Sequence, residues 1–127
     1  MATFKLEGID HIAINVSDME ESVAWYRDVL GLERRHRNWE MPVMLCAGST
    51  CVALFRAPQA PKWKHPDAGE AGIRHLAFRA AREDFQQAQA ALSSRGIPFQ
   101  FEDHDMAHSI YFQDPDGIQI EITTYEV

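Results

Sequence analysis

The stretch GIDHIAI at residues 8–14 is repeated later in the chain as GIRHLAF at residues 72–78. Four of the seven positions are identical, and the other apolar positions stay apolar in the second copy. The two stretches start 72 − 8 = 64 residues apart, which is about half of the 127 residues. Repetition at this distance indicates that the chain consists of two copies of one supersecondary unit.

A helix is predicted after each copy. In the first half, Ser17 as N-cap and Glu20 three positions later form a capping box, and Gly31 ends the helix. In the second half, the helix is predicted over about residues 82–95 and ends at Gly96. The two glycines lie 96 − 31 = 65 residues apart, so the repeat extends through the strand and the helix.

Three strands are predicted after each helix, so that each half has the order βαβββ and the fold class is α+β. We expect one domain, residues 1–127, with module 1 at about 6–57 and module 2 at about 72–126. The proline-containing segment 58–71 is a linker or a functional loop. The predicted strands are 32–37, 41–46 and 51–56 in module 1, and 98–103, 109–113 and 118–124 in module 2.

Composition excludes several classes of protein. There are 19 acidic and 12 basic residues, which gives a net charge of −7 and argues against a nucleic-acid partner. No apolar run approaches the roughly 18 residues of a membrane span, and the N-terminus lacks a signal-peptide pattern. We therefore expect a cytoplasmic protein without a membrane partner, and reduced thiols at Cys46 and Cys51.

The alternation of side chains along the strands gives the candidate metal ligands. His11 and His75 occupy the same position of the repeat, on the strand face opposite the residues that pack on the helix. Glu121 lies on the corresponding face of the last strand. A single such residue is usually exposed to solvent, but two equivalent histidines and a carboxylate make a 2-His-1-carboxylate set. Such a set binds divalent transition metals and leaves positions open for a substrate.

The paired G-I-x-H-[IL]-A strands and the run SIYFQDPDGIQIE at residues 109–121 resemble the vicinal oxygen chelate superfamily. This superfamily includes glyoxalases, extradiol dioxygenases, fosfomycin-resistance enzymes and bleomycin-binding proteins. The resemblance covers essentially the whole chain. It implies two βαβββ modules that form a curved mixed sheet around a cavity with a metal on His11, His75 and Glu121, which meet either within one chain or across the two chains of a dimer. It also implies a homodimer and a small-molecule substrate that binds through two neighbouring oxygens.

The resemblance favours Fe(II) as the cofactor, with Mn(II), Ni(II), Co(II) or Zn(II) as alternatives. Glyoxalase I has a fourth protein ligand, a glutamate on the last strand of its first module. Ala53 stands at that position here, because it aligns with Glu121 of the second module. The usual chemistry of glyoxalase I is therefore disfavoured for this chain. Fosfomycin thiol transferases resemble the chain at Ser109 and Tyr111 but have a small hydroxyl residue in place of Ala13.

Extradiol dioxygenases have a tyrosine that matches Tyr111, ten residues before the glutamate ligand, and His and Asp residues just upstream. Tyr111 is therefore a candidate catalytic residue, together with His104 or His108 as a proton carrier. His108 lies on the strand face opposite Tyr111 if the strand is regular, which favours His104. The predicted substrate-binding residues are Ala13, Phe55, Ser109 and Tyr111.

Three function classes follow. The first is a metal-dependent dioxygenase, which these residues favour. The second is a redox-neutral lyase, isomerase or epoxide-opening transferase at the same site. The third is a metal-free binding protein for a small molecule, which the intact ligand set disfavours. Trp63 and His65 in the proline-containing segment are either a lid over the cavity or part of a linker.

Overall fold

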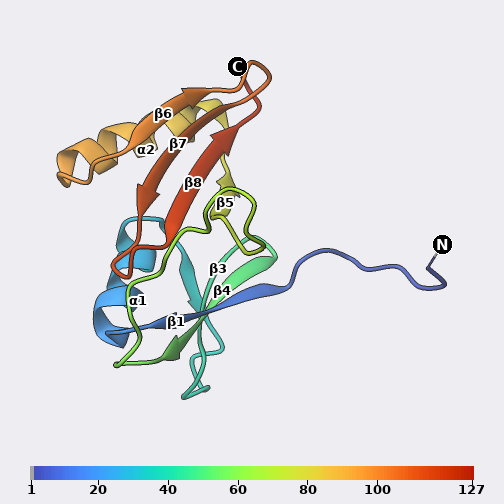
Figure 1. Cartoon of the computed structure of the whole chain (residues 1–127), viewed down its shortest axis with the longest axis vertical. Coiled ribbons are helices and arrows are strands. Elements are labelled where there is room, and N and C mark those ends of the chain that lie inside the picture. The colour runs from blue at the N-terminus through green and yellow to red at the C-terminus, as the bar shows by residue number, and fades with distance from the viewer. Residues whose placement is uncertain (1) are drawn as a thin grey trace. The chain divides into compact units, whose positions relative to one another are not determined.

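The computed structural model describes residues 2–127, and the chain divides into two compact units. The first unit ends at Ala60 and the second begins at Pro61. Each unit contains four strands and one helix in the order βαβββ (Figure 1). The α+β class and the tandem βαβββ modules are therefore confirmed.

The first unit has one four-stranded mixed sheet in the order β1-β4-β3-β2. β1 is parallel to β4, and the other neighbours are antiparallel. Its elements are β1 (His11–Val16), α1 (Met19–Asp28), β2 (Glu33–Arg35), β3 (Val43–Ala47) and β4 (Thr50–Arg56).

The second unit has a separate four-stranded sheet in the equivalent order, β5-β8-β7-β6. β5 is parallel to β8, and the other neighbours are again antiparallel. Its elements are β5 (Leu76–Arg79), α2 (Arg82–Ser94), β6 (Gln100–Asp103), β7 (His108–Gln113) and β8 (Gln119–Thr124).

The registers of the two sheets match position by position. Ala13 pairs with Ala53 in the first unit, and Ala77 pairs with Glu121 in the second. Ala53 also pairs with Met44 on the third strand of its sheet, where Glu121 pairs with Tyr111. Ala53 and Glu121 are thus structurally equivalent, as the sequence alignment predicts.

The core of each unit lies between its helix and one face of its sheet. α1 packs against β3 and β4, and α2 packs against β8 (Figure 1). Each helix contributes one aromatic side chain that is completely buried, Tyr26 in α1 and Phe85 in α2. Burying an apolar side chain of this size stabilises the fold by about 2–3 kcal/mol. The opposite face of each sheet is left for other contacts.

The first helix begins one residue later than the capping-box pattern predicts. Asp18, not Ser17, is the N-cap, and its side chain accepts a hydrogen bond of 3.1 Å from the backbone N–H of Glu21. Asp and Ser are similarly good N-caps, so the pattern alone does not separate two adjacent candidates. Glu21 therefore occupies the position that the sequence assigned to Glu20.

The expectation of reduced thiols is wrong, because Cys46 and Cys51 form a disulfide. The two residues are directly opposite each other on β3 and β4, with their Cα atoms 3.9 Å apart. Both side chains are buried on the sheet face that faces away from α1. The sequence predicts the hairpin that brings them together, but the expectation of a cytoplasmic protein favoured reduced thiols.

The segment between the modules lies against the turn between β7 and β8. The backbone N–H of Trp63 donates to the carbonyl oxygen of Asp116 at 2.9 Å, and Lys62 Nζ donates to the carbonyl oxygen of Pro115. From Pro61 onward, the segment therefore belongs structurally to the second unit.

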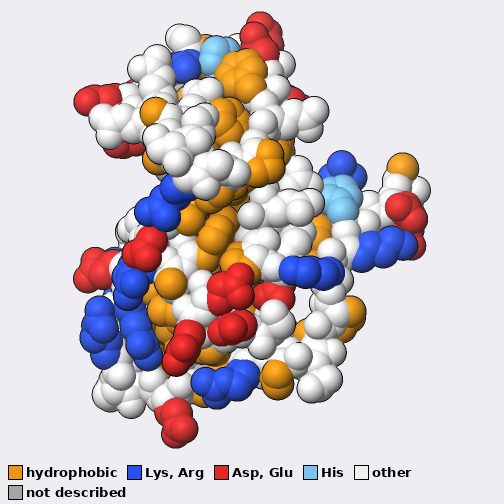
Figure 2. All heavy atoms as spheres, turned by 90° about the vertical axis from the view of Figure 1, so that its left-hand side faces the viewer, with side chains coloured by type: hydrophobic (Ala, Val, Ile, Leu, Met, Phe, Trp, Pro, Cys, Tyr) orange, Lys and Arg blue, Asp and Glu red, His pale blue; other side chains and the backbone are white. Residues whose placement is uncertain are grey.

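Figure 2 shows both acidic and basic side chains on the face in view.

Within residues 2–127, none of the helices has the length and apolar character that crossing a bilayer would require.

Candidate active site

The sheet face opposite α2 carries a connected group of polar side chains. Ser109 and Tyr111 alternate along β7 with the buried residues Ile110 and Phe112. Glu121 projects from β8 to the same polar face, because it is directly opposite Tyr111 in the register. The second unit thus has a helix-side face of apolar residues and an opposite face with functional groups.

Glu121 is the centre of this group, and its side chain is largely buried. One carboxylate oxygen, Oε1, lies 2.8 Å from His75 Nε2, and the other, Oε2, accepts a hydrogen bond of 2.7 Å from Ser109 Oγ. Ser109 is completely buried, and its Oγ also lies 3.0 Å from Thr123 Oγ1. An ionised carboxylate accepts hydrogen bonds only, so His75 Nε2 carries the proton in this pair.

The donor atoms of this pair fit a divalent metal. Imidazole nitrogen and carboxylate oxygen are the ligands of the 2-His-1-carboxylate set, and His75 Nε2 and Glu121 Oε1 already converge. The bond from Ser109 fixes the carboxylate orientation, which is the usual task of a residue behind a metal ligand.

Tyr111 lies beside this pair and is held as a neutral phenol. Its ring centre is 5.8 Å from that of His75, in an edge-to-face arrangement. Burial raises the pKa of Tyr111, and the negative charges of Glu121 and Glu102 raise it further. Tyr111 therefore retains its proton at neutral pH and can donate a hydrogen bond to a bound oxygen.

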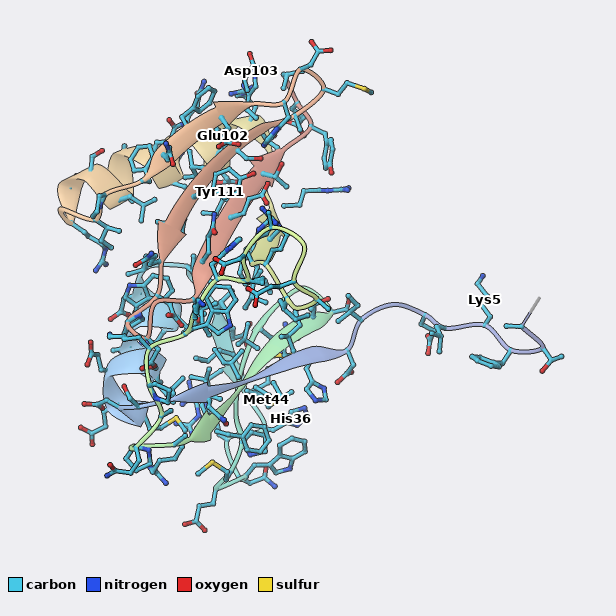
Figure 3. All side chains as sticks on the ribbon, viewed as in Figure 1. Lys5, His36, Met44, Glu102, Asp103 and Tyr111 are labelled. Carbon is cyan, nitrogen blue, oxygen red and sulfur yellow. A yellow bond between two sulfur atoms is a disulfide. The ribbon has the colours of Figure 1, made fainter. Side chains whose placement is uncertain are left out.

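Of the two candidate proton carriers, only His104 contacts Tyr111. His104 Nε2 lies 2.9 Å from the Tyr111 hydroxyl and 3.5 Å from Glu102 Oε2. Glu102 and Tyr111 lie on the neighbouring strands β6 and β7 (Figure 3). His104 follows β6 in the turn between these strands, and from there its ring reaches the Tyr111 hydroxyl.

His108 is held on the other side of the sheet. Arg82 Nη2, from α2, lies 2.8 Å from His108 Nδ1, and Asp103 Oδ1 lies 3.5 Å from His108 Nε2. A guanidinium group only donates hydrogen bonds, so His108 Nδ1 accepts from Arg82. The alternation argument that favoured His104 over His108 agrees with these positions.

The third predicted ligand, His11, lies in the first unit. Its Nδ1 is 2.7 Å from Asp10 Oδ2, and both side chains are exposed. If Nδ1 donates to this carboxylate, the lone pair of Nε2 remains free for a metal. Ala13 and Phe55 lie on the same sheet face as His11, and both are exposed.

Ala53 lies among apolar residues and is completely buried. It clusters with Met44 and the disulfide residues Cys46 and Cys51. Where glyoxalase I has its fourth metal ligand, this chain therefore has a buried alanine in contact with apolar side chains.

Across residues 2–127, neither unit brings three or more His, Cys, Asp or Glu side chains together as a group that could hold a metal ion. The second unit supplies two convergent donors, His75 and Glu121. His11 is the third predicted donor and belongs to the first unit.

A cavity of about 350 Å³ opens beside His75 within the second unit. The sequence left His65 open as part of a lid or a linker, and the structure places it in the wall of this cavity. Sequence reasoning missed Arg74, although its place beside the repeated histidine was a signal. The lining residues are mostly polar: His65, Arg74, His75, Gln100, Glu102, Tyr111 and Gln119.

A second cavity of about 720 Å³ shares two of these lining residues, Gln100 and Tyr111. Its other walls are largely apolar and include Ile97, Phe99 and Phe112. A less polar cavity therefore adjoins the same two residues that line the polar cavity beside His75.

Residues 8–122 match the family model of the Glyoxalase/Bleomycin resistance protein/Dioxygenase superfamily. The chain therefore belongs to this superfamily, and the resemblance inferred from the repeat is confirmed.

Three similar proteins illustrate the relationship. Glutathione transferase FosA of Serratia marcescens is 31% identical over 117 residues, which cover 92% of this chain and 80% of FosA. Metallothiol transferase FosB of Staphylococcus epidermidis is 30% identical over 126 residues, which cover 94% of this chain and 83% of FosB. A crystal structure of a glyoxalase/dioxygenase from Nostoc punctiforme matches with a TM-score of 0.83 and 27% identity. That match covers 98% of this chain and 95% of the other.

Proposed function

We propose that the protein is a divalent-metal-dependent enzyme that binds a small substrate through two neighbouring oxygens, with His11, His75 and Glu121 as the metal ligands. One observation carries the proposal. The buried carboxylate of Glu121 has one oxygen at His75 Nε2 and the other fixed by Ser109. Burying a carboxylate costs several kcal/mol unless charges or hydrogen bonds compensate, so such an arrangement indicates a functional role.

The residues around this pair have separate tasks. A divalent metal held there would act as a Lewis acid that stabilises negative charge on the substrate oxygens. Tyr111 donates a hydrogen bond to one of these oxygens, because its raised pKa keeps the phenol protonated. His104 exchanges a proton with the Tyr111 hydroxyl, because its Nε2 lies within hydrogen-bonding distance of that group.

For the reaction itself, we propose redox-neutral group transfer. The support is the names of the two curated relatives, a glutathione transferase and a metallothiol transferase, at 31% and 30% identity. In such a step the thiol sulfur loses its proton and forms a carbon–sulfur bond, a carbon–oxygen bond of the substrate breaks, and the released oxygen takes up a proton. This is the second of the three function classes that the sequence left open.

The extradiol dioxygenase, which the sequence favoured, remains the second candidate. The observation in its favour is the contact of 2.9 Å between His104 Nε2 and the Tyr111 hydroxyl. This pair is an acid–base couple next to the proposed metal ligands. Fe(II) is the metal for this reaction, whereas Mn(II), Ni(II), Co(II) or Zn(II) suit the redox-neutral one.

An anaerobic calorimetric titration with Fe(II), Mn(II) and Zn(II) tests the proposed function. We expect one metal per chain in the wild type and an affinity at least about 100-fold lower in His75→Ala. His36→Ala is the matched control, since His36 is an exposed histidine of the first unit. No binding by the wild type, or equal binding by wild type and His75→Ala, would contradict the metal site.

Two assays on the metal-loaded protein separate the reactions. Loss of a thiol with an epoxide substrate under anaerobic conditions supports group transfer, whereas oxygen uptake with a panel of catechols supports the dioxygenase. Tight ligand binding by protein stripped of metal, with neither activity, would support a binding protein instead. We further propose that the protein is cytoplasmic and forms a homodimer. Size-exclusion chromatography with light scattering tests the oligomeric state.

A further inference from the structure

The repeat places residues of opposite charge directly before its two histidines. Asp10 precedes His11 in the first copy, and Arg74 precedes His75 in the second. The carboxylate of Asp10 contacts the ring of His11 at 2.7 Å. Arg74 instead lines the cavity of about 350 Å³ beside His75. One position of the repeat therefore has two different tasks in the two copies.

The guanidinium group of Arg74 has its hydrogen-bond donors available. In the part of the chain that the structure describes, residues 2–127, it makes no hydrogen bond or ion pair. The nearby carboxylates have other partners, because Glu121 contacts His75 and Ser109 and Glu102 contacts the His104 ring. An arginine with five donors and a fixed charge, in the wall of a cavity, is suited to a planar or tetrahedral oxyanion.

The rest of the cavity supports the same ligand chemistry. Gln100 and Gln119 contribute amide groups to the lining, and Tyr111 contributes a phenol. Each of these groups can donate a hydrogen bond to an oxyanion. The protein as a whole carries a net charge of −7, so it repels anions except where a local cation attracts them.

We propose that Arg74 binds an oxyanion group of the substrate, a carboxylate, phosphate or phosphonate that is separate from the two oxygens on the metal. The assignment of this occupant as the substrate rests on the proposed function. The anion site itself rests on the cavity, on the free guanidinium group and on the engaged carboxylates around it. The substrate class is then a small anion with two further neighbouring oxygens.

The proposal is tested with metal-free protein and two probes, inorganic phosphate and acetate, in ¹H–¹⁵N correlation spectra at constant ionic strength. We expect saturable shifts of signals from the cavity residues in the wild type. Arg74→Gln should weaken the binding at least about ten-fold, whereas Arg74→Lys, which keeps the charge but loses the paired donors, should give an intermediate value.

Arg37→Gln is the matched control. Arg37 is an exposed arginine of the first unit, so its replacement changes the net charge equally and leaves the cavity intact. Binding in this variant should equal that of the wild type. Shifts with phosphate alone assign the site to phosphates and phosphonates, and shifts with acetate as well extend it to carboxylates. Binding that survives in Arg74→Gln, or the absence of shifts with both probes, would overturn the proposal.

A metal titration of the same variants separates this inference from the proposed function. Arg74→Gln should bind metal like the wild type, because its side chain is not a ligand. If the wild type binds no metal but still binds phosphate through Arg74, the metalloenzyme fails and the anion site stands. If Arg74→Gln keeps both metal and phosphate binding, the anion site alone fails.

Discussion

The two units have the same fold and register but opposite chemistry on the sheet face that lies away from the helix. In the first unit, Ala53 is paired with Met44 next to the disulfide of Cys46 and Cys51. At the equivalent positions of the second unit, Glu121 is paired with Tyr111. Around Ala53 the first face is apolar and carries the disulfide, whereas around Glu121 the second face carries a network of hydrogen-bonded polar side chains.

This difference shows how a duplicated unit becomes specialised. The helix side of each sheet is apolar in both units, because both must bury a helix. The other face is free to differ, and within residues 2–127 it carries a buried carboxylate with its partners in the second unit alone. The first unit keeps one candidate ligand, His11, which contacts the exposed Asp10.

The largest expected effect tests the part that the two units share. Tyr26→Ala and Phe85→Ala should each lower the free energy of unfolding by about 3–5 kcal/mol, because both side chains are completely buried against a sheet. Urea denaturation measures this effect. Phe4→Ala is the control, since Phe4 is 70% exposed and should change stability by less than about 0.5 kcal/mol. A loss below about 1 kcal/mol in either core variant would break the equivalence of the two helix-side cores.

A smaller effect tests the polar network that only the second unit has. Ser109→Ala removes the hydrogen bond to Glu121 Oε2, so the proposed metal affinity should fall about 10–100-fold. Calorimetric titration with Mn(II) measures the change. Ser49→Ala, at an exposed position of the first unit, should leave the affinity unchanged. An affinity of Ser109→Ala within about two-fold of the wild type would show that Ser109 does not orient the carboxylate.

The corresponding change in the first unit should have a weaker effect. Asp10→Asn removes the negative charge next to His11 Nδ1, and we expect metal affinity to fall about ten-fold or less. The effect is small because the side chain of Asp10 is 86% exposed, where water screens the interaction. The same titration measures it, with Glu7→Gln as an exposed acidic control. If Asp10→Asn lost more metal affinity than Ser109→Ala, this would contradict the expectation that the second unit contributes more to metal binding than the first.

The smallest expected effect is a change of stability with pH that comes from Tyr111 in the second unit. The pKa of Tyr111 is raised in the folded protein above its ordinary value of 10.0, mainly by burial. The unfolded chain therefore loses the phenol proton first as the pH rises, and this contribution to stability decreases above about pH 10. In metal-free protein, the stability difference between wild type and Tyr111→Phe should thus decrease from about pH 9 to about pH 11.

Urea denaturation across this pH range measures the difference, with Met44→Leu as the control. Met44 occupies the equivalent position in the first unit and has no titrating group, so its difference from the wild type should stay constant. A constant difference for Tyr111→Phe as well would show that Tyr111 titrates alike in the folded and unfolded protein.

The sequence by itself determined the repeat, the order of the elements and the sheet face of each candidate ligand. These properties follow from the alternation of side chains along strands and from helix-ending glycines, which are local in the chain. They place His75, Glu121 and Tyr111 on one face before any contact is known. The start of α1 at Asp18 was missed by one residue, because two good N-caps are adjacent.

Only the tertiary structure decided which of these side chains touch. His75 meets Glu121 across 46 residues of sequence because β5 pairs with β8. Alternation already favoured His104 over His108, but only the path of the turn after β6 brings the His104 ring to the Tyr111 hydroxyl. The same holds for the disulfide of Cys46 and Cys51, and for Arg74 in the wall of the cavity. Contacts of this kind depend on register, loop packing and the positions of neighbouring charges, which no local pattern in the sequence contains.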